Sequence, residues 1–201
     1  RLDLGIAIRR LVHLADAARA VEHCRVHGVT HLHAHFGQAP ATIAWFAAAI
    51  GNMAEGERWT WSFTIHGFQD FVNESDARLD LKAASASFVV CVSDFTRSQL
   101  CRVTDPRLWD RFHVVRCGID LAAFPVRAAR PMPEDPRVLV VARLSAEKGH
   151  VVLLHALARL RAEGTPATVE VIGSGPYEPE IRAEVEMLGL GDAVRLHGEL
   201  L

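Results

Sequence analysis

A regular alternation of short β-rich runs and longer helical runs constrains this sequence more than any other feature. Strands are predicted at 30–36, 60–65, 87–92, 113–116, 138–142, 168–172 and 193–196. Helical patterns lie between them, and strands joined by crossover helices pair in parallel. The sequence therefore predicts an α/β fold with doubly wound parallel sheets.

Several of the helical runs have recognisable ends. A glycine stops the first, at 6–27, while Pro40 opens the second and Gly51 is predicted to end it, because proline favours the first turn and glycine the last. Ser93 and Asp94 are candidate caps of the helix that follows them. Further helices are predicted at 79–84, 149–163 and 178–188.

A proline-rich segment interrupts the alternation. "RAARPMPEDP" at 127–136 has no apolar periodicity and is predicted to be an exposed connector,. It separates an N-terminal domain at 1–126 from a C-terminal domain at 137–201. Each half is too short for a complete doubly wound sheet, and the chain begins within a helical pattern. We therefore expect a piece of a longer protein, with the start of one domain and the end of the other missing.

Composition excludes some classes of function. With 22 Lys and Arg against 24 Asp and Glu, the net charge of -2 gives no basis for a nucleic-acid partner,. The four cysteines form no C-x-x-C pair, which is typical of reduced thiols in a cytoplasmic protein,. No apolar run reaches the roughly 20 residues of a membrane span. P-loop and G-x-S-x-G motifs are also absent from the sequence, which argues against P-loop NTPases and α/β-hydrolases.

The strongest candidate site is "VVARLSAEKGH" at 140–150, where Arg143 ends a strand and Lys148 starts a helix. Ligands of open α/β sheets bind beyond the carboxyl ends of the strands. A helix N-terminus adds unpaired N–H groups and positive potential, so two cations there suit a diphosphate. The alternative is that both are surface charges, or that Lys148 pairs with Glu147.

A second candidate is the glycine turn in "VEVIGSGPYEPE". Gly173 and Gly175 allow a tight turn and the close approach of a ligand. The order of strand, G-x-G, helix and strand resembles a dinucleotide fingerprint, with Glu199 near the place of the ribose-binding acid. Glu178 occupies the third glycine position, where its carboxylate would repel a pyrophosphate. A glycine turn without a ligand stays open as the other interpretation.

Histidines mark the first half of the chain. His66 and Gly67 follow a strand in "FTIHGFQDF", and an imidazole can donate or accept near neutral pH, although a lone histidine is more often structural. "HLHAHF" places His31, His33 and His35 on one face of a strand. Imidazoles spaced along a straight strand cannot all reach one zinc ion at about 2.1 Å. We predict no metal site and expect His33 and His35 to line the carboxyl edge of the sheet.

Taken in order, seven motifs resemble glycosyltransferase family 4, the retaining enzymes of GT-B fold. They are "HAHF", "TIHG", "VCVSDFTRSQL", "VVRCGID", "VARLSAEKG", "VIGSGP" and "VRLHG", running from near residue 30 to the end. Within that family, "SFTIHGFQDF" and "VVRCGIDLAAF" are similar to bacterial exopolysaccharide and colanic-acid biosynthesis enzymes. The family's opening strand with its glycine-rich loop, and its later acidic motif, have no counterpart in the chain.

The resemblance implies two Rossmann-like domains, an acceptor-side domain first and a nucleotide-sugar-binding domain second. It implies that Arg143 and Lys148 bind the donor diphosphate, and that His66 is the catalytic residue facing the donor sugar. Further contacts with the nucleotide are implied for Gly173, Gly175, His197 and Gly198.

The implied reaction moves a sugar from a UDP- or GDP-sugar with retention of configuration, without a further cofactor. The implied acceptor is a glycan or a polyprenyl-diphosphate-linked oligosaccharide, so peripheral contact with the inner face of the membrane is expected. We expect the chain alone to be inactive. Two other functions stay open: a sugar-nucleotide epimerase of GT-B shape, and a NAD- or nucleotide-binding oxidoreductase domain on residues 173–199.

Overall fold

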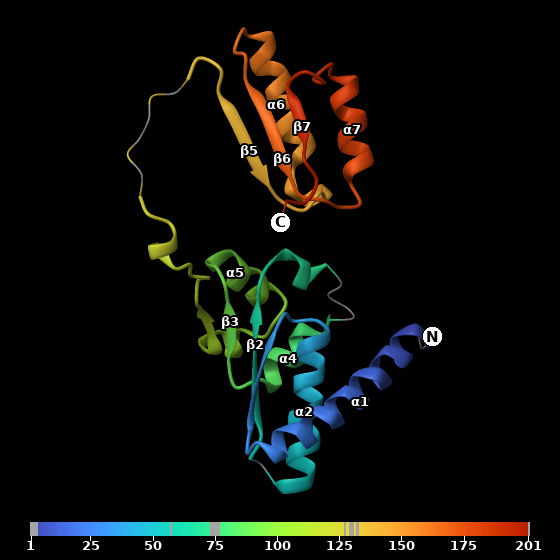
Figure 1. Cartoon of the computed structure of the whole chain (residues 1–201). Helices are drawn as coiled ribbons and strands as arrows, with labels where there is room; N and C mark the ends of the chain where they lie inside the picture. The colour runs from blue at the N-terminus through green and yellow to red at the C-terminus, as the bar shows by residue number, and fades with distance from the viewer. Residues whose placement is uncertain are drawn as a thin grey trace. The chain divides into compact units, whose positions relative to one another are not determined.

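The chain folds into two compact α/β units, divided between Phe124 and Pro125 (Figure 1). The structure is a computed structural model that describes residues 4–56, 58–72, 77–126, 128, 131 and 133–200. The division lies beside the predicted connector at 127–136. The predicted domain bounds themselves stay predictions.

The first unit is built on a four-stranded sheet in the order β1-β2-β3-β4, with every neighbouring pair parallel. Its strands are β1 (His31–His35), β2 (Thr60–Ile65), β3 (Val89–Cys91) and β4 (Phe112–Val114). Its helices are α1 (Leu4–Val26), α2 (Ala39–Glu55), α4 (Leu79–Ser85) and α5 (Asp94–Arg102). The described part of this unit also contains three short 3-10 turns: η1 (Phe68–Phe71), η2 (Pro106–Arg111) and η3 (Leu121–Ala123).

Small side chains let α2 approach its neighbours closely. Its buried positions include Ala41, Ala44 and Ala48, and the same core contains the fully buried Phe63 and Ile65 of β2. Because alanine has no side chain beyond Cβ, a helix face of alanines can pack closely against its neighbours, and the apolar area buried in this contact stabilises the fold. The helix α1 packs along α2 and adds Ala17 and Val21 to the core, as the two blue helices of Figure 1 show.

The second unit has a three-stranded parallel sheet in the order β5-β6-β7. Its strands are β5 (Arg137–Val141), β6 (Thr168–Ile172) and β7 (Val194–Leu196), its helices are α6 (His150–Ala162) and α7 (Glu178–Met187), and η4 (Ala146–Lys148) precedes α6. Leu154 and Leu157 of α6 and Ile181 of α7 form the core with Val169 and Val171 of β6. The predicted α/β fold with parallel sheets is therefore confirmed.

One predicted boundary was wrong. The helix expected to end at Gly51 continues to Glu55, and its C-cap is Gly56, whose φ of 80° is in the left-handed region. Gly51 is buried inside the helix, and a Cβ there would lie 2.3 Å from the Trp59 ring. The glycine is explained by this close contact with an indole and not by a helix end.

Among the residues that the structure describes, no helix combines the length and the apolar character needed to cross a bilayer.

This contact predicts the effect of Gly51→Ala. The added methyl group overlaps the indole of Trp59, so we expect a loss of about 1–3 kcal/mol in the free energy of unfolding, the range typical of overpacked cores. Gly118→Ala is the matched control, because a Cβ at Gly118 meets no atom within 4 Å. Denaturant unfolding followed by tryptophan fluorescence measures both, and equal stability of the two variants would contradict this account of Gly51.

Candidate functional site

The carboxyl edge of the second sheet gathers the predicted donor-site residues of that unit. Arg143 lies two residues beyond β5, Gly173 directly follows β6, and His197 directly follows β7. Because the three strands are parallel, their carboxyl ends meet at one edge,. Lys148 ends η4 on the way into α6, so its position beside a helix N-terminus is also as the sequence indicates.

Backbone hydrogen bonds join these three loops directly. The Leu144 N–H donates to the Ser174 carbonyl at 2.8 Å, and the Tyr177 N–H donates to the Leu144 carbonyl at 3.1 Å. The Gly173 N–H donates to the Gly198 carbonyl at 2.8 Å. The loop carrying Arg143 is thus fixed to the glycine turn, and the glycine turn to the loop after β7.

The two glycines of the turn are required by this close approach. Gly173 has φ 139°, and a Cβ there would lie 2.0 Å from the carbonyl oxygen of Ala142. A Cβ at Gly175 would lie 2.2 Å from the carbonyl oxygen of Leu144. Any side chain would push the two backbones apart. The packing of the loops therefore accounts for G-x-G without a ligand, and a nucleotide contact at these glycines is a separate proposal.

The two cations differ in their surroundings. Arg143 is 64% exposed, and its guanidinium lies 3.3 Å from the Glu147 carboxylate, to which Ser145 Oγ donates at 2.7 Å. The Ser145 hydroxyl, with a smaller contribution from Arg143, holds the pKa of Glu147 below its usual value. Lys148 is exposed and forms no ion pair within the described part of the chain. The alternative pairing of Lys148 with Glu147 is therefore wrong, since Glu147 contacts Arg143.

A buried histidine that the sequence analysis did not single out contacts the backbone of the Arg143 loop. His150 is 3% exposed, and its Nε2 lies 3.2 Å from the Arg143 carbonyl oxygen. It follows Gly149, which has φ 71° and turns the chain into α6. A histidine on the inner face of a helix, directly after a glycine, was the only available signal.

The side chains of the loop after β7 form hydrogen bonds with β6 and with the loop after it. His197 Nε2 is hydrogen-bonded to the Glu170 carboxylate, and this bond is the main cause that lowers the pKa of Glu170 below its usual value. Ser174 Oγ donates to Glu199 at 2.5 Å. The His197 ring is thus held against β6. Gly198 has φ 71°, and its carbonyl oxygen accepts the hydrogen bond from the Gly173 N–H of the glycine turn.

The first unit has its own cluster at the carboxyl edge of β1 and β2. His66 and Gly67 directly follow β2, and His35 is the last residue of β1. His35 Nδ1 lies 2.8 Å from His66 Nε2, and the Phe36 ring lies 4.7 Å from the His66 ring. The structure therefore brings His35 and His66 together, whereas His33 lies further back, over the face of the sheet.

Along that face the imidazoles alternate with hydroxyl groups of β2. His31 bonds Thr60 and Ser62 at 2.7 and 2.8 Å, and His33 bonds Ser62 and Thr64 at 2.7 and 2.8 Å. Burial lowers the pKa of His33, and the neighbouring histidines lower it further. Among the described residues no group of three His, Cys, Asp or Glu side chains could hold a metal ion.

Two buried charged residues that the sequence analysis missed fix the loops of this edge. Asp70 is 2% exposed and accepts hydrogen bonds from the Gly37 N–H at 2.7 Å and the His66 N–H at 2.9 Å. Lys82, fully buried, donates to the carbonyl oxygens of Gly37 at 2.7 Å and Gln38 at 2.9 Å. The Gly37 peptide is therefore held from both sides, and Asp70 joins it to the backbone of His66.

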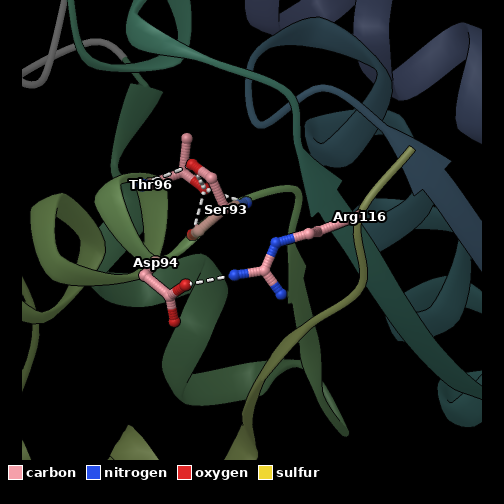
Figure 2. Close-up of polar contacts among 4 residues, drawn as sticks. All are labelled: Ser93, Asp94, Thr96 and Arg116. Atoms are coloured by element: carbon pink, nitrogen blue, oxygen red, sulfur yellow. Dashed lines mark hydrogen bonds and ion pairs between the residues drawn. The ribbon is translucent and has the colours of Figure 1, made fainter. Parts of the chain in front are cut away.

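The third strand leads into a capped helix at the same edge (Figure 2). Ser93 caps α5 with Thr96 in a reciprocal capping box, as the sequence predicts for Ser93. Asp94 is the first helical residue, and the guanidinium of Arg116, beyond β4, lies 2.5 Å from its carboxylate. Both side chains are largely exposed, so this ion pair adds little stability.

The chain is similar in sequence and in fold to known glycosyltransferases. WcaL of Escherichia coli (strain K12), named as a colanic acid biosynthesis glycosyltransferase, is 29% identical over 107 residues, which cover 53% of this chain and 26% of WcaL. Anabaena Alr3699/HepE, solved in complex with UDP and glucose, superposes with a TM-score of 0.72 at 18% identity, over 92% of this chain and 51% of that one. The lipopolysaccharide outer core galactosyltransferase WaaB superposes with a TM-score of 0.67 at 16% identity, over 96% and 49%.

These structural likenesses show a GT-B fold, which confirms the predicted fold class. Residues 126–200 match the family model of glycosyl transferases group 1. The chain spans about half the length of the solved structures and 26% of the length of WcaL.

The glycine turn predicts the effect of Gly175→Ala. Its methyl group collides with the backbone of Leu144, so we expect the second unit to lose about 1–3 kcal/mol of stability and the Arg143 loop to shift. Gly191→Ala is the control, because a Cβ there meets nothing within 4 Å. Thermal unfolding and amide chemical shifts of the Arg143 loop test this, and unchanged shifts at Leu144 would contradict it.

The buried carboxylate predicts the effect of Asp70→Asn. An amide has one acceptor oxygen in place of two, so one of the two buried N–H groups loses its partner. We expect a loss of about 1–3 kcal/mol, the usual cost of an unsatisfied buried donor. Asp110→Asn, at an exposed position of η2, should leave stability unchanged. Denaturant titration decides, and a stability of Asp70→Asn equal to that of the control would contradict the assigned bonds.

Proposed function

We propose that this chain is the donor-binding part of a glycosyltransferase. That enzyme transfers a sugar from a nucleotide diphosphate to a glycan or lipid-linked acceptor with retained configuration, as in glycosyltransferase family 4. One observation carries the proposal: Arg143 and Lys148 lie beside the glycine turn and the N-terminus of α6, at the carboxyl edge of a sheet whose residues match the group 1 family.

The chemistry of these groups suits a leaving diphosphate. As the bond from sugar to diphosphate breaks, negative charge grows on the leaving oxygen. Preorganised cations and helix N–H groups stabilise that charge more than they stabilise the bound donor. Arg143 and Lys148 would supply the cations, and the first N–H groups of α6 would supply the dipole.

The Arg143 guanidinium already contacts one anionic group. The Glu147 carboxylate lies beside it, held there by the Ser145 hydroxyl. A carboxylate occupies the position that suits an anion, and a donor diphosphate would compete with it for the guanidinium. We propose that the chain's partner is a UDP- or GDP-sugar; HepE was solved in complex with UDP and glucose.

The oxidoreductase alternative receives less support. Glu178 is the first residue of α7, directly after the glycine turn, and it pairs with Arg182. A dinucleotide pyrophosphate would have to bind at this helix start, against a carboxylate. The epimerase alternative shares the donor site and differs in its products, because it releases a nucleotide without using an acceptor.

Substitution of the two cations tests the proposal. In this chain, Arg143→Ala or Lys148→Ala should weaken UDP or GDP binding by roughly tenfold or more, the effect of losing a hydrogen bond to a charged group. In a complete enzyme, sugar transfer should slow on the order of 10²–10³-fold. Isothermal titration with UDP-, GDP- and ADP-sugars and with NAD measures the binding.

Arg159→Ala is the matched control, because Arg159 is an exposed arginine in the last turn of α6. It should bind the nucleotides as the wild type does. Unchanged affinity in both cation variants, or binding of NAD alone, would contradict the proposal.

A further inference from the structure

Both the backbone and the side chain of His66 are held by neighbouring residues. The backbone N–H of His66 donates to the buried Asp70, and the ring nitrogen Nε2 of His66 lies 2.8 Å from His35 Nδ1. The two imidazole centroids are 5.0 Å apart, and the Phe36 ring lies 4.7 Å from the His66 ring.

Backbone strain accompanies this arrangement. Phe36 has φ 75°, in the left-handed region where a bulky residue costs roughly 1–3 kcal/mol,. Such strain persists only where neighbouring contacts enforce it. Here Asp70 and Lys82 hold the next peptide, at Gly37, from both sides. The strained turn places the Phe36 ring against His66.

The bond between the two imidazoles has a strict requirement. A neutral imidazole has one N–H donor and one acceptor nitrogen. At the contact between His35 Nδ1 and His66 Nε2, one ring must donate and the other must accept. Each ring's tautomer is therefore tied to the tautomer of the other.

The other imidazoles of β1 are hydrogen-bonded to hydroxyl groups. The ring nitrogens of His31 and His33 bond the hydroxyls of Thr60, Ser62 and Thr64, and both rings share Ser62. A hydroxyl rotates and can donate or accept, but its one hydrogen cannot serve both rings, so Ser62 couples the two tautomers only in part. Among the described histidines of β1, only His35 is hydrogen-bonded directly to another imidazole.

We propose that His35 is a positioning residue that fixes the orientation of His66 and ties the tautomer of His66 to its own. The bond occupies His66 Nε2, so Nδ1 is the one ring nitrogen that His66 can offer to a ligand. The matching ligand group is a hydroxyl, which can meet Nδ1 as donor or as acceptor. That a sugar hydroxyl of the donor is this ligand rests on the proposed function.

Two-bond ¹H–¹⁵N correlation spectra of the histidine-labelled chain test the inference, because they show which ring nitrogen carries the proton. At about pH 8.5, well above the ordinary imidazole pKa of about 6.5, we expect complementary tautomers, in which only one of His35 Nδ1 and His66 Nε2 is protonated. His35→Leu should remove this constraint and change the tautomer populations of His66. His35→Asn should keep a hydrogen bond to His66 Nε2, since its carboxamide lies near the position of Nδ1 and can donate or accept, and should therefore give His66 signals closer to those of the wild type than His35→Leu does.

His31→Leu is the control: it removes an imidazole from the same face of β1 and should leave the His66 signals unchanged. Thermal unfolding of each variant checks that the first unit remains folded. If a folded His35→Leu variant keeps the wild-type His66 signals, the inference is overturned. The same result follows if the wild-type rings show independent tautomer mixtures.

Addition of UDP-glucose or GDP-glucose separates this inference from the proposed function. A shift at His66 Nδ1 with Nε2 unchanged supports both. If the tautomers remain tied but neither nucleotide sugar shifts His66, the proposed ligand is wrong and the role of His35 stands.

Discussion

The second unit depends on the close approach of two backbones, the loop after β5 and the glycine turn after β6. The Leu144 N–H reaches the Ser174 carbonyl at 2.8 Å, and a Cβ at Gly173 or Gly175 would lie 2.0 or 2.2 Å from a backbone oxygen. Parallel pairing puts the loops at one edge, but only glycine lets them touch. This contact fixes the place of Arg143 and with it the geometry of the proposed diphosphate site.

In the first unit, buried charged side chains hold neighbouring loops together. Asp70 and Lys82 are buried, and both hold the peptide of Gly37, while Asp70 also holds His66. Buried charges are stable only when they are well hydrogen-bonded, and here their partners include backbone groups of two neighbouring loops. These contacts of Asp70 and Lys82 position the loops that carry His35 and His66.

The sequence predicted those features that depend on local pattern. Strands at 60–65 and 168–172 and the cap at Ser93 match the structure, because β-branched runs and capping residues act within a few positions of themselves. Gly51 was misread because its reason is an indole eight residues away in sequence. A glycine that ends a helix and one that admits a ring look alike in a sequence.

The candidate site was predictable to a similar extent. The α/β rule alone placed Arg143 and His66 at strand ends and Lys148 at the start of a helix. Asp70 and Lys82 were not, because a charged residue in a turn or on a short helix is usually exposed, and burial depends on the tertiary fold. The tie between His35 and His66 needed the register that pairs His35 with Thr64.

The central claim is that a nucleotide diphosphate binds at the carboxyl edge of the second sheet. Amide chemical-shift mapping of the ¹⁵N-labelled chain with UDP and GDP tests it most directly. The account predicts saturable shifts at Lys148, Gly149, Ser174 and Gly198, with Asp135 and Asp192, which precede β5 and β7 at the opposite edge, unchanged. Shifts confined to that opposite edge, or no shifts with either nucleotide, would contradict it.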